Sequence, residues 1–298
     1  MKDAAAIFTL LVASVSSAQV ETAGRNAAEQ QDQHMGSEPI YRITVVSRTT
    51  KAINYGHRSE PTKIGFQGTV LMPVAHGEAL IESQRGATAI KTRFDRVDAP
   101  TKFGPEYLTY VVWAISPEGR PVNLGELVLN SSNKGKLALS THLQSFALIV
   151  TAEPYFAVTQ PSDVVVMENV VRPDTVGKIA ELNAKYELLP RNQFTYDTAA
   201  TVAVPDTPKV SVDQYEALLA LYQAQNALQI AKAAEADRYA SDSFQKADQL
   251  YRQAQNYQSQ KGASKRVVMT AREAAQAAED ARAISVKRQE VQKNVNQQ

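Results

Sequence analysis

Carboxylates near the ends of β-rich runs are the side chains of this sequence whose type could break a bond. Glu106, Glu118, Glu126 and Glu153 stand at such positions. A glycoside hydrolase needs two carboxyl groups about 5–10 Å apart, one acting as acid and the other as base or nucleophile. Sequence spacing does not fix that distance, and we interpret Glu106 and Glu118 as solvated loop residues. Glycan hydrolysis is therefore our third-ranked function, and we predict no catalytic residue.

Metal and cofactor chemistry finds little support in the residue types. The histidines, His34, His57, His76 and His142, are scattered along the chain, and the sequence has no cysteine. Zinc sites are usually built from closely spaced His and Cys ligands. The sequence also lacks the glycine-rich and serine-centred motifs of nucleotide binding and ester hydrolysis. We predict no metal and no cofactor.

One polar stretch, SRTTKAINYGHRS at residues 47–59, is a candidate binding surface. Its basic and aromatic residues are Arg48, Lys51, Tyr55, His57 and Arg58. Such a group could bind an acidic glycan or the tail of a partner protein. An edge strand that uses Lys and Arg to block pairing with another chain explains the same residues, and we favour that interpretation.

Length and charge limit the classes of partner. The chain has 298 residues, enough for two ordinary domains. Its 32 basic and 31 acidic residues give a net charge of +1. A balanced charge provides no field of one sign over the molecule, so we predict no nucleic-acid partner.

The N-terminal residues predict export. An apolar run at residues 4–15 precedes Ser16 and Ala18, the small residues that a signal peptidase accepts, so cleavage before Gln19 is expected. The run is shorter than the roughly 20 residues that span a bilayer. We predict a signal peptide at residues 1–18, a disordered linker at 19–39, and no transmembrane helix after cleavage.

Residues 40–171 read as an antiparallel β domain. Short β-branched and aromatic runs alternate with Gly, Pro, Ser and Asn clusters, and no helix-length amphipathic segment separates them. This spacing is typical of a sandwich or a barrel. Both faces of residues 108–115 are apolar, which predicts a central strand with Trp113 as a core anchor. We predict an immunoglobulin-like β-sandwich.

Residues 210–298 read as helical and follow a connector at 172–209, for which helix and strand both stay open. Ser211 or Asp213 would begin one helix, Ser241 or Asp242 a second, and a third follows Gly262. We predict an antiparallel helical hairpin or coiled coil of two or three helices. Larger side chains recur at helical spacing and form a predicted interaction face of Tyr215, Leu218, Tyr222, Phe244, Leu250 and Tyr257.

The last predicted helix carries a seam of small residues. It consists of Val267, Ala271, Ala274, Ala278, Ala281 and Ser285. Alanine buries little apolar area, and burial stabilises by about 25 cal/mol per Å². We therefore expect these helices to dock on an envelope protein or to self-associate.

The alanine-rich region resembles the helical domain of unknown function that bacterial envelope proteins carry ahead of an OmpA-like domain. The resemblance rests on the A-L-x-x-A steps of the first helix, on YASDSFQKADQLYRQAQ, and on the alanine ladder of residues 271–283. No OmpA-like domain follows within this sequence, so the resemblance implies an envelope location and transfers no wall-binding site.

These patterns together predict an α+β, multidomain chain that is exported to the bacterial periplasm or outer envelope. We predict a non-enzymatic protein whose β domain is a recognition or spacer module and whose helices dock or oligomerise. The alternative is a module that binds cell-wall or surface glycan through residues 48–58.

Overall fold

The computed structural model describes residues 46–56, 60–175, 182–188 and 211–296. The predicted signal peptide and linker therefore lie outside the described residues, as do His57 and Arg58. The side chain of Arg48 is not described either.

The first part of the described chain is all antiparallel β structure, with one short 3-10 helix, η1 (Pro100–Phe103). Its strands are β1 (Val46–Asn54), β2 (Thr62–Gly68), β3 (His76–Gln84), β4 (Ala87–Asp95), β5 (Thr109–Ile115), β6 (Pro121–Leu127), β7 (Gly135–Thr141), β8 (Ser145–Glu153), β9 (Val165–Val170) and β10 (Leu182–Leu188).

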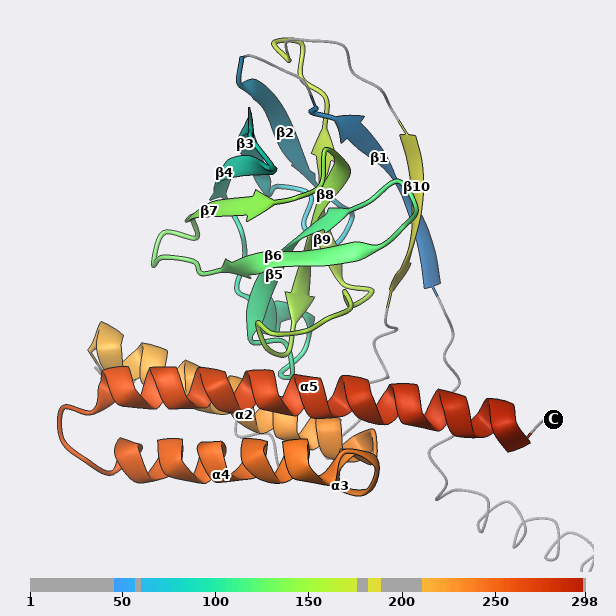
Figure 1. Cartoon of the computed structure of the whole chain (residues 1–298). Coiled ribbons are helices and arrows are strands. Elements are labelled where there is room, and N and C mark those ends of the chain that lie inside the picture. Colours follow the sequence, from blue (N-terminus) through green and yellow to red (C-terminus); the bar gives the residue numbers. More distant parts are fainter. Residues whose placement is uncertain (1–45, 57–59, 176–181, 189–210, 297–298) are drawn as a thin grey trace, which may run out of the picture. The chain divides into compact units, whose positions relative to one another are not determined.

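Eight of these strands curl into a nearly closed barrel (Figure 1). Their hydrogen-bonded order is β6-β5-β8-β9-β2-β3-β4-β7. The two end strands have no ladder between them but lie side by side, because a Cβ atom added at Gly125 of β6 would sit 3.2 Å from Leu139 Cδ2 of β7. Gly125 has a φ of +145° and stands at a β-bulge opposite Val112 and Trp113. Bulges bend strands, and this one helps to turn β6 toward β7.

The predicted sandwich is therefore wrong in detail, although an antiparallel β domain followed by helices is confirmed. One sheet rolls around a single apolar interior that includes Tyr55, Phe66, Phe94 and Phe146. Short alternating strands are compatible with both architectures, and the sequence does not reveal which strands become neighbours.

β5 is a central strand covered on both faces, as predicted. All its residues are buried. Tyr110, Val112 and Ala114 point into the barrel, while Val111, Trp113 and Ile115 belong to a second apolar cluster outside it. That outer cluster also contains Ala52 of β1, Ala184 and Leu188 of β10, and residues of the helices. Trp113 is thus a core anchor, but of the layer that covers the barrel.

β1 and β10 form a ribbon attached to the barrel. They pair along Val46–Ala52 and Leu182–Leu188, and β1 then pairs with the start of β8 at Ile53 and Asn54. β10 lies within the predicted connector, where the choice between helix and strand had stayed open, and it is a strand.

Three long helices and one short turn of helix form a bundle (Figure 1). They are α2 (Val212–Ala233), α3 (Ala236–Tyr239), α4 (Ser241–Gln258) and α5 (Ser264–Asn296). A capping box between Ser211 and Gln214 begins α2, as one of the two predicted caps required. The predicted cap of the second helix is wrong, because Ala240 precedes α4 and no side chain caps it.

The predicted small-residue seam of α5 is confirmed. All six seam residues are buried between α5 and the helices it packs against, α2 and α4. None of the helices in the described part of the chain combines the length and the apolar character that crossing a membrane requires. The barrel and the bundle belong to one compact unit.

Candidate functional site

The most concentrated set of buried ionisable groups lies where the barrel meets the helices. Glu279 of α5 is fully buried, and its carboxylate accepts two hydrogen bonds of 2.7 Å from the guanidinium of Arg282. It also accepts a hydrogen bond of 2.6 Å from the Tyr155 hydroxyl, and two from Thr159, through the backbone N–H and the hydroxyl. Tyr155 and Thr159 belong to the loop between β8 and β9, so this carboxylate ties a barrel loop to α5.

The ionisation state of Glu279 follows from these partners. Burial alone would raise the pKa of this carboxyl, but the charge and hydrogen bonds of Arg282, with those of Thr159 and Tyr155, hold the pKa below its ordinary value. Burial, followed by the charge of Glu279, raises the pKa of the Tyr155 hydroxyl well above its usual range. The loop is therefore held by an ionised carboxylate that accepts from a neutral tyrosine.

A second polar contact joins the helices to β6. Glu126, whose side chain is 7% exposed, accepts hydrogen bonds from Thr109 Oγ1 and Gln223 Nε2, both at 2.8 Å, and from Arg272 at 2.5 Å. The guanidinium of Arg272 also stacks 3.7 Å from the ring centre of Phe156. We call this set, together with Glu279, Arg282, Tyr155 and Thr159, the barrel–helix clasp.

Two buried amides of α2 bind backbone groups of the β8–β9 loop and of the segment that precedes β5. Gln223 accepts a hydrogen bond from the backbone N–H of Phe156, and Asn226 donates to the carbonyl oxygens of Glu106 and Pro154. These amides satisfy loop backbone groups that burial would otherwise leave without partners.

Glu153, on β8, is also fully buried but has a different environment. One carboxyl oxygen accepts hydrogen bonds from the Thr151 hydroxyl and the Ser162 N–H, while Oε2 has no hydrogen-bond partner among the described residues. Burial raises the pKa of Glu153 to about 8, against the opposing effect of those hydrogen bonds. Trp113 Nε1 donates to Thr151, so the carboxyl ends a short chain of hydrogen bonds inside the outer cluster.

The four glutamates considered for glycan hydrolysis are thus used differently. Glu126 belongs to the clasp and Glu153 is buried in the outer cluster, whereas Glu118 is exposed in its turn and Glu106 is half-buried. None of the four lines the hollow between β4, β7 and α2 or the hollow over the outer sheet face. Glu118 and Gly119 border a third hollow, of about 450 Å³, with Arg120 and Lys185.

The predicted binding surface at residues 48–58 needs a correction at Tyr55. That side chain is buried in the barrel interior, with its ring centre 4.6 Å from that of Phe146, so it is not part of an exposed surface. Lys51 is exposed on β1, which pairs with β10 along this stretch. Tyr55 directly follows β1, and with Ile53 it continues the alternation that points every second side chain into the barrel. The sequence interpretation gave more weight to the neighbouring charged residues than to this alternation.

The predicted helical interaction face is mostly turned inward. Phe244, Leu250 and Tyr257 pack against the outer cluster, and Leu218 and Tyr222 are half-buried. Tyr215, by contrast, is 47% exposed. The face therefore serves largely for packing within the chain.

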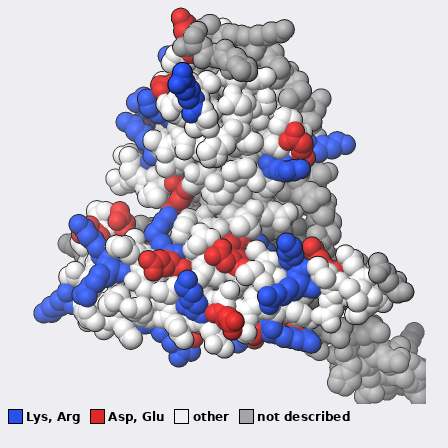
Figure 2. All heavy atoms as spheres, viewed as in Figure 1, with Lys and Arg blue, Asp and Glu red and all other residues white. Residues whose placement is uncertain are grey.

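Sequence reasoning did not single out the outward face of β2, β3, β4 and β7, where exposed basic side chains lie beside Glu78 and Glu82 of β3. Lys63, Lys91, Arg93 and Lys136 are all exposed there, on three of the four strands. Arg93 lies directly opposite Lys136 in the ladder between β4 and β7, and Lys63 and Lys91 flank Leu80 of β3. Figure 2 shows Lys and Arg gathered at the barrel margin that carries these strands, whereas both signs of charge mix over the helices.

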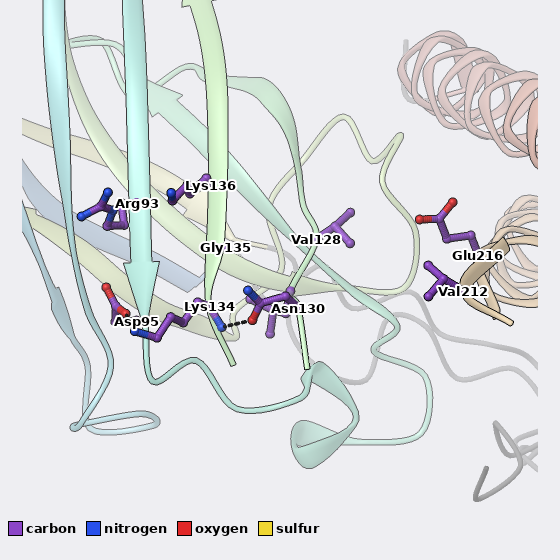
Figure 3. A pocket seen from close by; sticks show the side chains of 10 residues that line it. Arg93, Asp95, Val128, Asn130, Lys134, Gly135, Lys136, Val212 and Glu216 are labelled. Carbon is purple, nitrogen blue, oxygen red and sulfur yellow. Dashed lines mark hydrogen bonds and ion pairs between the residues drawn. The ribbon is translucent and has the colours of Figure 1, made fainter. Parts of the chain in front are cut away.

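Two hollows adjoin this face. One, of about 300 Å³, lies over the four strands, and the other, of about 760 Å³, lies between β4, β7 and the first turns of α2. Both are lined by Arg93 and Lys136, and Figure 3 shows these two residues at the larger hollow. The alternation of Lys91 and Arg93 with inward residues was readable from the sequence, but the strand order that joins them to Lys63 and Lys136 was not.

Metal-binding geometry is not seen among these groups. Within the residues that the structure describes, no three His, Asp or Glu side chains gather as a metal site would require. Comparison with protein-family models, with curated proteins and with solved structures gave no match to this chain.

Proposed function

We propose that this chain is an exported, non-enzymatic protein of the bacterial cell envelope, in which the barrel is a recognition body braced by the alanine-rich helices. The observation that carries the proposal is the clasp. The buried carboxylates of Glu126 and Glu279, with their partners Arg272 and Arg282, serve to join the two parts of the chain. Because these residues hold the two parts together and are not free for chemistry, we expect the barrel to act as a rigid body that presents a binding surface.

The apolar layers support the same role for the helices. The outward residues of β5 and the alanine seam of α5 belong to one continuous apolar cluster. Alanine lets helix backbones approach closely but buries little area on its own. The docking partner expected for the helices is therefore supplied, at least in part, by the barrel of the same chain.

The export part of the proposal is tested by cell fractionation. We expect the full-length chain, produced in bacterial cells, to be recovered from the periplasm or envelope with Gln19 as its first residue. Replacing Leu10 and Leu11 by Arg interrupts the apolar run and should leave the protein uncleaved in the cytoplasm. Recovery of the unaltered chain in the cytoplasm would contradict export.

The non-enzymatic part is tested by a hydrolase screen. Purified full chain is incubated with cell-wall and surface glycans, and reducing ends are counted. We expect no turnover. Turnover that disappears in either Glu126→Gln or Glu153→Gln, while the protein stays folded, would replace this proposal by a glycan hydrolase.

Glycan binding is the second candidate, and a specific observation favours it. The exposed basic side chains of the β2–β3–β4–β7 face, rather than residues 48–58, provide a surface suited to an acidic polymer.

A further inference from the structure

We propose that the outward face of β2, β3, β4 and β7 binds the carboxylates of a linear acidic glycan. We call this site the basic face. It is formed by Lys63, Lys91, Arg93 and Lys136, and it continues past Lys134 into the hollow at α2. This inference rests on the proposed function, because it assigns a ligand class to the barrel as a recognition body.

Two like charges face each other on β4 and β7, although Glu78 of β3 lies opposite Arg93 on its other side. Arg93 and Lys136 are directly opposed on adjacent strands, an arrangement that destabilises a sheet when the charges are alike. Neither forms an ion pair with any residue that the structure describes. An anionic group placed between them would convert this repulsion into two attractions.

Each acidic residue of the face is engaged with a cation. Glu82 uses a cation of the face itself, because its carboxylate lies 3.3 Å from Lys91 Nζ. Glu78 lies 3.0 Å from the guanidinium of Arg172, and Asp95 lies 2.8 Å from Lys134 Nζ. The hydrogen bond from Lys134 holds the pKa of Asp95 below its ordinary value, so this carboxylate stays ionised and paired. The charges of Arg93 and Lys136 therefore remain available to a bound anion.

The extent of the face fits a polymer better than a single small anion. The hollow over the strands and the hollow at α2 share Arg93 and Lys136 and therefore adjoin each other. From β2 to β7 there are three interstrand steps, or roughly 14 Å at about 4.8 Å each. Figure 3 shows Val212 and Glu216 of α2 across the larger hollow from Arg93 and Lys136.

The chemistry of the face favours an acidic glycan over a nucleic acid. The only aromatic residues of these four strands are Phe66 and Phe94, and both are buried inside the barrel. Single-stranded nucleic acids are usually held by stacking bases on aromatic side chains, which this face does not offer. Arg93 can hold a carboxylate with two parallel hydrogen bonds, and the lysines add point charges.

The test uses the full chain and polygalacturonate, in which each sugar carries one carboxylate. Binding is measured by isothermal titration calorimetry at low and high ionic strength. The matched neutral probe is the same polymer with its carboxylates methyl-esterified, and double-stranded DNA is the third probe. We expect binding to polygalacturonate that weakens with salt, and no binding to the ester.

The variants separate this face from charge in general. Arg93→Gln with Lys136→Gln should weaken polygalacturonate binding about tenfold or more, equal to about 1.4 kcal/mol. Lys246→Gln with Lys265→Gln removes the same charge from exposed positions of α4 and α5 and should leave the affinity unchanged. Circular dichroism checks that both variants stay folded.

Several results would overturn the inference: no binding at low ionic strength, equal binding of the ester, equal loss in both variants, or tighter binding to DNA. The cell fractionation described above is independent of these titrations. A chain that reaches the envelope but ignores polygalacturonate would defeat this inference alone, whereas a cytoplasmic chain would defeat the proposed function.

Discussion

Two buried glutamates on either side of the barrel–helix contact show how local partners decide the charge of a side chain. Glu279 has Arg282 on its own helix and three hydrogen-bond donors in the loop, and it stays ionised. Glu153 has only neutral donors and is protonated at neutral pH, with its pKa raised to about 8 by burial. A buried charge is tolerated where a partner compensates its lost hydration, and it is neutralised where none does.

The pH dependence of stability should carry the signature of Glu153. Its carboxyl binds a proton in the folded chain at pH values where the unfolded chain has released it. The free energy of unfolding therefore falls as the pH rises from about 4.5 to about 8. The slope from this group approaches about 1.4 kcal/mol per pH unit within that window. Urea unfolding of the full chain at a series of pH values measures it.

Glu153→Gln should flatten that dependence, because the amide stays neutral in both states. The matched control is Glu273→Gln at an exposed position of α5, which should leave the slope unchanged. Below about pH 4.5 stability should fall again for a different reason. Glu279 has a lowered pKa, so its contribution is lost as acid protonates it. A slope that is identical in wild type and Glu153→Gln would show that Glu153 is ionised in the folded chain.

At the scale of elements, the helices were easier to predict than the sheet. The seam of α5 was readable because helical spacing alone decides which of its residues share a face. β5 was readable because apolar residues occupy both of its faces. Each inference used only residues close together in the sequence.

Features that depend on residues far apart in the sequence could not be predicted. The closure of the barrel requires β6 to meet β7, and the ribbon requires β10 to pair with β1, and no local pattern states either pairing. The basic face shares this origin, because Lys63, Arg93 and Lys136 come together only through the strand order. The pair Glu279 and Arg282 left a weak local signal, namely two opposite charges three residues apart beside an alanine seam.

The close packing of α5 gives a prediction for the bundle. Ala278 is fully buried on the seam, and a leucine there would force α2 or α4 away. We expect Ala278→Leu to lower the free energy of unfolding by about 1–3 kcal/mol, the usual cost of overpacking a filled core. Ala283→Leu is the control, because position 283 is exposed on the same helix and both residues favour helix. Equal urea midpoints for the two variants would show that the seam accommodates a leucine side chain at position 278 without strain.

At the scale of the whole molecule, the shared apolar cluster and the clasp predict that barrel and helices unfold together. Trp113 is the only tryptophan of the chain and lies in the cluster common to both parts, so its fluorescence reports on their contact. Circular dichroism at 222 nm reports mainly on the helices. Large chains often unfold in steps, but here removal of the helices would expose the outward side of β5 to water. We therefore expect the two urea transitions of the full chain to coincide.

The variant Glu279→Gln tests more strictly whether barrel and helices unfold together. It leaves the mostly buried Arg282 without its charged partner. Breaking a buried ion pair in this way typically costs about 3–5 kcal/mol. If the clasp couples the two parts, the fluorescence and dichroism midpoints must fall by the same amount. Asp280→Asn changes the adjacent, exposed carboxylate and should move neither midpoint appreciably. A dichroism midpoint that falls while the Trp113 transition stays in place would mean that the helices detach from an intact barrel. The helices would then be a separable attachment, and the barrel would need no brace to keep its binding surface.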